Sequence, residues 1–318
     1  MVDRSPTGLT VILHGGDGST WHVHGDGQGQ EGVFCGKDQM KGLWDPPVRT
    51  AWASGARQRG GKPRGHWYDP RDLDLGFHLV AARVPGGDQE TLMGAFWGAF
   101  GFREDDYDWD AVLPRVQVIS PKSERWLDVQ KREQTDFNPS IDPLIRQHAN
   151  PVLSLRAGQP FYYEEPETSS WSTSSSSGAG TLKVWNPTPL PMFHKINLTR
   201  GDWTIGDRSI EGPPNHRFFG RSKRTGRDDS ERDILIAPIT TVQGGATIDL
   251  DPDALMIRDA HGTNMLGQMP VPGRYFEYEI PPHTQPLYIP VSVTNAPAGG
   301  AMAQLIMPRL WPLPIGGQ

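Results

Sequence analysis

Alternating apolar and polar residues in the last third of the chain predict short antiparallel strands. Within 246–250 every second residue is apolar, and the Asp-Pro-Asp sequence at 251–253 interrupts the run. Apolar residues resume at 255–257, and the alternation returns at 275–280, before two prolines at 281–282 end it. A period of two places successive side chains on opposite faces of a strand. We therefore expect a β-sandwich here, and we see no catalytic set of residues in it.

The same alternation, separated by glycine, proline and polar clusters, predicts strands throughout the rest of the chain. They are expected at 9–13, 21–24, 73–80, 116–119, 126–130, 152–155, 161–163, 181–185, 193–198 and 234–239. The first two are close enough, across the glycine-rich turn at 15–18, to form a hairpin.

One helix is predicted, at 88–100. Asp88 is a suitable N-cap, and apolar residues that include Leu92, Phe96 and Trp97 recur at spacings of three and four. This spacing gives one wide apolar face. We expect Leu92, Phe96 and Trp97 to be buried against a sheet or a neighbouring subunit.

A change in composition suggests where the 318 residues divide. The Ser-rich stretch 168–180 has too few apolar residues to order itself, so we expect a flexible connection or exposed loop there. The predicted domains are 1–166 and 167–318. The fold is mainly β: a β-rich N-terminal domain with one helix, then an all-β sandwich. We expect loops at 55–65, which is basic, and at 217–232, which is long and charged.

Charge and composition exclude several classes of function. With 31 basic and 37 acidic residues the net charge is −6, which does not favour nucleic-acid binding. No run of about 18 apolar residues is present for membrane insertion, and no secretion signal is evident, so we expect a soluble chain made in a cytoplasm. The single cysteine, Cys35, is expected to be a small buried side chain rather than a reactive thiol.

Two glycine-rich segments are poor candidates for cofactor binding. Residues 27–32 match GxGxxG, but no strand–turn–helix unit surrounds them. Gly60-Gly61-Lys62 lacks the first glycine and the Ser/Thr of a phosphate loop. The basic residues Arg57, Arg59, Lys62 and Arg64 could instead bind phosphates or an acidic partner, or simply face solvent.

Metal and catalytic sites are also not predicted. His14, His22 and His24 could converge on a hairpin as zinc ligands, although exposed histidines are commoner there. The neighbouring acids Glu164-Glu165 and Asp105-Asp106 cannot by themselves face each other across a sugar. No GxSxG or HExxH motif is present. We therefore assign no catalytic, cofactor-binding or metal-binding residue.

The C-terminal domain contains two further groups of candidates. Asp249, Asp251 and Asp253 could attract calcium, but Pro252 and Ala254 replace what a calcium loop needs, so we expect them to cap a corner. We expect exposure for His261 and His283, which lie near turns. Tryptophans could stack on sugars or fill a core or subunit seam; they are Trp171, Trp185 and Trp203.

The order of three motifs is similar to that of a known family. They are RDLDLGF at 71–77, TLKVWNP at 181–187, and ATID at 246–249 followed by MIRDAHG at 256–262. The chain resembles the distal tail proteins of long-tailed bacteriophages, in particular the minor tail proteins of actinobacterial phages. It departs from them at Thr188-Pro189, where the family often has Gly-Asp, and in the stretches 168–180 and 217–232.

The resemblance implies a structural virion protein and not an enzyme. Six copies would form a ring between the tail tube and the tail tip, through the N-terminal domain, with a galectin-like C-terminal sandwich facing outward. The implied partners are other copies of the chain, the tail tube protein and tail tip or baseplate proteins, and host cell-wall carbohydrate is a further one. The protein would be assembled in the host cytoplasm and located in the virion. The alternatives are a carbohydrate-binding module for host adhesion and, less favoured, a β-sandwich hydrolase.

Overall fold

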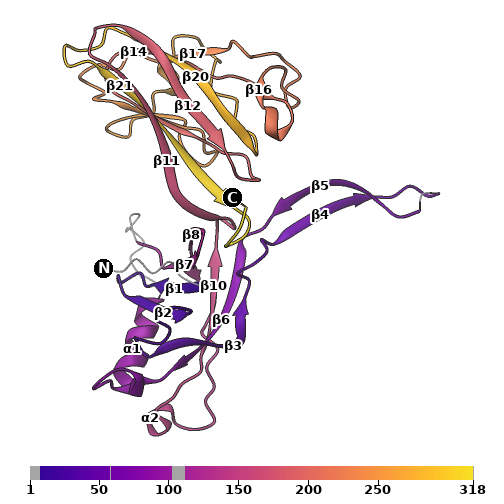
Figure 1. Cartoon of the computed structure of the whole chain (residues 1–318), viewed down its shortest axis with the longest axis vertical. Helices are drawn as coiled ribbons and strands as arrows, with labels where there is room; N and C mark the ends of the chain where they lie inside the picture. Colours follow the sequence, from indigo (N-terminus) through magenta and orange to yellow (C-terminus); the bar gives the residue numbers. More distant parts are fainter. Residues whose placement is uncertain (1–7, 58, 102–111, 318) are drawn as a thin grey trace. The chain divides into compact units, whose positions relative to one another are not determined.

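The chain folds into two compact units of mainly antiparallel strands (Figure 1). The computed structural model describes residues 8–57, 59–101 and 112–317. The first unit comprises Met1–Glu164 and Trp311–Gly316, and the second comprises Glu165–Leu310 and Gly317–Gln318. The mainly β fold agrees with the sequence prediction. The division differs from the predicted 1–166 and 167–318, because residues 311–316 return to the first unit.

The described residues of the first unit form three sheets. Its strands are β1 (Thr10–His14), β2 (Thr20–His24), β3 (Val33–Lys41), β4 (Val48–Ala53), β5 (Lys62–Tyr68), β6 (Arg71–Leu79), β7 (Arg115–Ser120), β8 (Ser123–Asp128), β9 (Gln130–Lys131), β10 (Val152–Ala157) and the start of β11 (Tyr162–Thr173). One sheet has the order β8-β7-β1-β2, and β11 joins it where Tyr163 lies opposite Trp126. A second sheet has the order β3-β6-β10-β9, and β4 pairs with β5 in a third.

Helix α1 (Gln89–Ala99) packs on the core of the first unit as the sequence predicts. The side chain of Asp88 accepts a hydrogen bond from the backbone N–H of Thr91, which confirms the N-cap. Phe96 is buried, and its ring lies 5.4 Å from that of Trp21 and 5.1 Å from that of Phe77. Leu92 and Trp97 are only half-buried, although both contact the same core.

The prediction of a single helix is wrong, because α2 (Pro143–Arg146) forms a second, short one. Asp142 caps it by accepting from the N–H of Leu144, and Pro143 stands at its first position. Gln147 ends it in the left-handed conformation. A helix of four residues makes barely one turn, so it has no apolar periodicity to reveal it. A 3₁₀ turn, η1 (Ala81–Arg83), precedes α1.

The second unit is a sandwich. Its remaining strands are β12 (Gly178–Asn186), β13 (Lys195–Leu198), β14 (Asp202–Gly206), β15 (Ile210–Glu211), β16 (Phe218–Phe219), β17 (Asp233–Leu235), β18 (Ala246–Asp249), β19 (Ile257–Asp259), β20 (Thr284–Thr294) and β21 (Ala301–Trp311). Strands β19-β18-β13-β21-β11 form one layer and β12-β20-β14-β17 the other. Both layers contribute to one apolar core, with Trp203 fully buried in it. Strands β15 and β16 pair separately, and η2 (Pro214–His216) and η3 (Leu266–Gln268) are 3₁₀ turns.

The Ser-rich stretch 168–180 was predicted to be a flexible connection or an exposed loop, but most of it is strand and only 174–177 form an exposed turn. It contains the end of β11, the turn at 174–177 and the start of β12. Gly178 and Gly180 pair with Val293 and Val291 of β20, and Trp171 packs on the core. Backbone pairing and one tryptophan thus order a segment whose serines bury little surface.

The predicted strand at 275–280 is also wrong in part. Burial alternates as expected, with Phe276, Tyr278 and Ile280 inside, but only Ile280 forms a β-bridge. The N–H groups of Glu277 and Tyr278 are directed to the carboxylate of Asp207 instead of to a neighbouring strand. The carboxylate of Asp207 thus takes the place of the backbone hydrogen bonds that a neighbouring strand would accept.

Replacing Phe96 by alanine tests the packing of α1. We expect the first unit to lose about 3–5 kcal/mol of unfolding free energy, because the change leaves a cavity among aromatic rings. Trp97→Asp should destabilise less, since Trp97 is half-buried. Gly94→Ala is the control: Gly94 is exposed in the same helix with open space at its Cβ position, so we expect a gain of about 0.5–1 kcal/mol. Urea unfolding of the full chain measures all three, and equal stabilities would contradict this packing.

Candidate interaction surface

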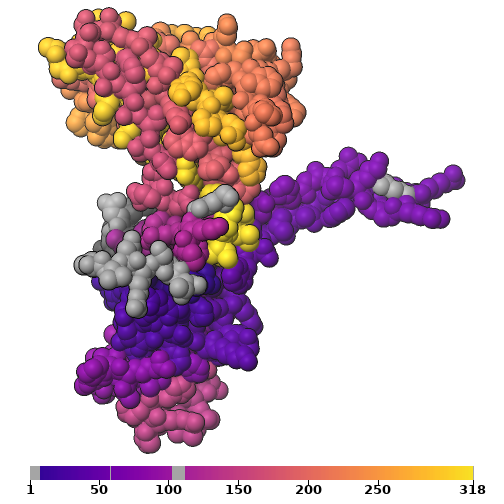
Figure 2. Space-filling model, viewed as in Figure 1, coloured from indigo at the N-terminus to yellow at the C-terminus, as the bar shows by residue number. Residues whose placement is uncertain are grey.

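Strands β4 and β5 form a two-stranded ribbon, which we call the arm. Their register runs from Val48 opposite Tyr68 to Ala53 opposite Lys62, and among the described strands neither pairs with any other. Almost every residue of the arm is exposed, and it forms a narrow projection (Figures 1 and 2). The basic loop predicted at 55–65 is therefore partly strand, because Lys62–Gly65 pair with β4. The alternation of apolar and polar residues at 48–53 was too weak to predict β4, the strand with which 62–65 pair.

Tryptophans line the arm and its root. Trp52 is 63% exposed, Trp67 48%, and Trp44, just before β4, 47%. An isolated two-stranded hairpin is at best marginally stable in water, and large exposed apolar groups on one feature are typical of protein interfaces. The arm is thus the strongest candidate for a surface that a partner covers.

Contacts at the root of the arm join its two strands to each other and attach Tyr68 to the rest of the first unit. Arg49 forms a bidentate ion pair with Asp69, and its guanidinium lies 6.0 Å from the centre of the Trp67 ring. The ring of Tyr68 meets that of Phe161 edge-on at 4.8 Å. These contacts set where the arm begins but leave its far end free to meet a partner.

The arm is basic although the chain as a whole is acidic. Between residues 48 and 68 there are five basic residues and no acidic one, whereas the net charge of the chain is −6. Four of the five lie at or near the tip and are exposed: Arg57, Arg59, Lys62 and Arg64. Opposite charges on two surfaces steer association and favour one orientation. The arm is therefore suited to an acidic protein surface.

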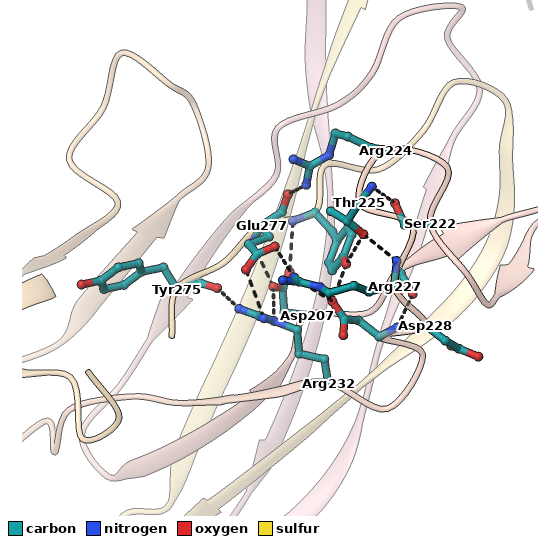
Figure 3. Close-up of polar contacts among 12 residues, drawn as sticks. Asp207, Ser222, Arg224, Thr225, Arg227, Asp228, Arg232, Tyr275 and Glu277 are labelled. Carbon is teal, nitrogen blue, oxygen red and sulfur yellow. Dashed lines mark hydrogen bonds and ion pairs between the residues drawn. The ribbon is translucent and has the colours of Figure 1, made fainter. Parts of the chain in front are cut away.

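A polar network in the second unit holds the excursion 207–233 against residues 275–279 (Figure 3). At its centre the buried carboxylate of Asp207 accepts from the N–H groups of Glu277, at 2.9 Å, and Tyr278, at 3.3 Å. Arg232 donates to Asp207 from Nε at 3.0 Å and reaches Glu277 at 3.2 Å. Arg227 bridges Glu277 at 2.6 Å and Asp229 at 3.0 Å. The charges of 217–232 are thus largely paired, which explains how so polar a segment is held in place.

Burial raises the pKa of the Asp207 carboxyl to about 6, and the two backbone N–H groups and Arg232 only partly offset this. Asp229 behaves oppositely: the Tyr278 hydroxyl that it accepts from lowers the pKa of its carboxyl. Asp207 is therefore a group that changes charge close to neutral pH. The arrangement acts as a structural clamp, because its hydrogen bonds and ion pairs join the excursion 207–233 to residues 275–279.

The glycine-rich candidates and Cys35 have structural positions. Residues 27–32 form turns between β2 and β3, with Gly27, Gly29 and Gly32 at positive φ, and no helix follows them. Gly60-Gly61 belong to the tip of the arm. Cys35 is buried in the first core, and burial raises the pKa of its thiol to about 12, which leaves it unreactive.

The three candidate histidines do not converge. His14 lies opposite Thr20 and bonds Gln117 at 2.7 Å, while His22 lies opposite Ile12 and its Nδ1 is 2.7 Å from Glu31. His24 lies opposite Val11. Within the described residues, no group of three or more His, Cys, Asp or Glu side chains is placed to hold a metal ion.

The candidate acids are also separated. Glu164 lies 3.9 Å from Arg125, and Glu165 is exposed. Asp105 and Asp106 lie outside the described residues. The side chain of Asp249 accepts from the N–H of Asp251, and that of Asp251 from the N–H of Asp253, both at 3.0 Å. These acids cap the corner between β18 and β19, as the sequence predicts, and His261 and His283 are exposed.

The three candidate tryptophans serve the packing of the second unit. Trp203 is fully buried and donates from Nε1 to the carbonyl of Thr199 at 2.7 Å. Trp171 meets it edge-on at 6.1 Å. Trp185 is half-buried, with the cations of Lys183 and Arg309 at 5.1 and 5.5 Å from its ring centre. Stacking on sugars therefore gains no support from these tryptophans.

The fold is similar to that of a solved phage hub protein. The chain is similar to the Dit protein (gp 19.1) of phage SPP1, described as a paradigm of the hub adsorption apparatus of phages that infect Gram-positive bacteria. The TM-score is 0.54 at 9% identity, over 94% of this chain and 98% of that one. Chains of the phage P2 baseplate in its activated conformation, with Ca and with Sr, match with TM-scores of 0.49 and 0.48 at 9% identity, each over 95% of this chain and 98% of the other.

Other comparisons add no relative. No family model matches the chain, and no curated protein sequence matches it either. Across the described residues, no helix has the length and apolar character needed to span a membrane.

The titration of Asp207 gives a pH dependence of known sign. Its folded pKa of about 6 exceeds the ordinary value of 3.8, so the folded state binds the proton more tightly than the unfolded state. The contribution of this group to stability therefore rises as the pH falls from about 6 to 3.8. Relative to Asp207→Asn, we expect the unfolding free energy of the native second unit to gain about 2 kcal/mol between pH 7 and pH 4.

Urea unfolding of both proteins at several pH values measures this difference, in which the other titrating groups cancel. Asp228→Asn is the matched control, because Asp228 is an exposed neighbour in the same segment. It should follow the native protein at every pH. If the difference in unfolding free energy between the native chain and Asp207→Asn stays constant with pH, Asp207 does not titrate in this range.

Proposed function

We propose that the chain is a distal tail protein: a structural, non-enzymatic subunit that forms a ring at the end of a phage tail. The observation that carries the proposal is the likeness of fold to the SPP1 Dit protein along almost the whole of both chains. The order of the sequence motifs at 71–77, 181–187 and 246–262 supports it independently.

The arm supplies a physical means of forming the ring. Its exposed tryptophans and cations would form one side of a contact, and a neighbouring copy, whose net charge is −6, would supply the other. Because the two sides differ, the contact is head-to-tail, and repetition by rotation closes a ring. The first unit is then the ring-forming domain, and six copies is the number that the family resemblance implies.

The remaining partners follow from this location. The ring would lie between the tail tube protein and the proteins of the tail tip or baseplate, and would serve as their assembly hub in the virion after assembly in the host cytoplasm. Within the family, the sequence motifs favour the type found in phages of actinobacteria. The two proposed domains would have separate roles. Domain 1–166, with the short return of 311–316, would form the ring, and domain 167–318 would make outward contacts. The carbohydrate-binding alternative is weaker, because the tryptophans that suggested it pack within the second unit.

Removing the tryptophans of the arm should weaken the ring. Burying each aromatic stabilises a contact by roughly 1.5–3 kcal/mol, so we expect Trp52→Ser with Trp67→Ser to raise the dissociation constant at least about 100-fold. Native mass spectrometry of the purified full chain across concentrations measures this. Val242→Ser is the control, because Val242 is 73% exposed in the second unit. A native chain that stays monomeric at every concentration would contradict the proposal itself.

Charge on the arm predicts a salt dependence. We expect the ring to dissociate as NaCl rises from 0.05 to about 0.5 M, because exposed charges are screened. Replacing the four cations of the arm tip by glutamine should remove most of that dependence; they are Arg57, Arg59, Lys62 and Arg64.

A matched variant carries four glutamines in place of exposed cations elsewhere: Lys37, Arg146, Arg221 and Arg274. It should retain the native salt dependence. If the two quadruple variants behave alike, net charge rather than the arm controls association.

A further inference from the structure

Residues 311–316, Trp-Pro-Leu-Pro-Ile-Gly, leave the second unit and complete the first. Trp311 is 2% exposed and belongs to the first core, and Pro314 is also buried. Ile315 packs partly on the same core. Two prolines restrict the backbone of this segment, so it is suited to bind in an extended form.

The first side chain that holds the segment is Arg71, at the start of β6. Its guanidinium is completely buried, and Nη2 donates to the carbonyl of Pro312 at 2.8 Å. From Nε it donates to Pro160, in the turn before β11, at 2.7 Å. The ring of Tyr162 lies 4.9 Å from its guanidinium carbon. Arg71 thus joins the returning segment to the framework of the first unit.

The second is Arg125 of β8, which is also completely buried. It donates from Nη1 to the carbonyl of Leu313 at 2.9 Å and from Nη2 to that of Gly316 at 2.6 Å. Its guanidinium lies 4.0 Å from the centre of the Trp311 ring. Three residues of the segment therefore surround this one cation.

Both guanidinium groups require these contacts, because burying a cation costs free energy unless polar groups replace the water around it. Removing the segment would take one carbonyl from Arg71, and two carbonyls and an aromatic face from Arg125. Charge-assisted hydrogen bonds are also stronger than neutral ones. Arg71 and Arg125 together form a socket for the main chain of an extended peptide.

Arg71 also binds the root of the arm. Its Nη1 is 2.8 Å from the carbonyl oxygen of Leu43, 3.1 Å from that of Gly42 and 3.4 Å from that of Trp44. The hydroxyl of Tyr162 donates to the same Leu43 carbonyl at 2.9 Å. One guanidinium therefore contacts both the returning segment and the residues from which the arm extends.

We propose that residues 311–316 act as a tethered peptide ligand whose binding to the Arg71–Arg125 socket fixes the root of the arm. The segment follows residues 165–310 of the second unit in the chain, so the first unit is completed only after these have been made. A chain lacking the segment would have a loosened arm and would be excluded from the assembly. The consequence for assembly rests on the proposed ring function, whereas the link between segment and arm root does not.

Hydrogen exchange on the full chain tests the link, in high salt and at a concentration where the chain is monomeric. In Trp311→Ala we expect amide exchange in peptides that cover 42–47 and 158–164 to accelerate at least tenfold, with no change in the second unit. Leu313→Ala is the matched control, because Leu313 is 38% exposed and contributes its carbonyl, which the change retains. It should leave exchange at the native rate.

Two further measurements keep the test decisive. If Trp311→Ala unfolds the first unit, a synthetic peptide of residues 309–317 should restore its protection, while Trp311→Phe should be close to native. Unchanged exchange at 42–47 in a folded Trp311→Ala chain would overturn the inference. Unfolding of both units together would also overturn it, and so would a peptide that fails to restore protection to an unfolded first unit. A native chain that forms no ring would contradict the proposed function and leave the exchange result unaffected.

Discussion

Two guanidinium groups, those of Arg71 and Arg125, lie in the interior of the first unit, and several distant parts of the chain must meet to surround them. Backbone carbonyls come from residues 42–44, from Pro160 and from 312–316. Both side chains are fully buried, and this burial lowers the pKa of both groups. Because a buried cation requires such partners, the path of each of these segments is constrained by the same two charges. The root of the arm and the return of the chain from the second unit both depend on this constraint.

The regular strands and the helix were predictable because their apolar residues face a core. Strand β6 and helix α1 show the two periods clearly, and Asp88 caps the helix as its position suggests. The Ser-rich ends of β11 and β12 were not predictable, because main-chain pairing with β20 orders them. The extended segment 275–280 has the burial of a strand, but a carboxylate from Asp207 replaces the neighbouring strand.

The candidate surface was harder to predict than the fold. The four basic residues of the arm tip were visible in the sequence, yet their loop gave no indication of the ribbon that carries them. In the sequence, Trp52 and Trp67 resemble core residues. They are exposed because, among the described strands, β4 and β5 pair only with each other. The socket was invisible for a related reason: Arg71 and Arg125 bind main-chain carbonyls, which any residue type supplies.

The proposed ring gives the protein a definite position in a virion, between the tail tube and the tip. The most direct measurement is averaged electron microscopy of the tails of the phage that encodes this chain, with a small tag fused to an exposed loop of the second unit. We predict six equivalent tag densities around the axis, in one layer between the tail tube and the tip. Tags along the tube, tags at the end of a fibre, or tails that lack them altogether would contradict the account.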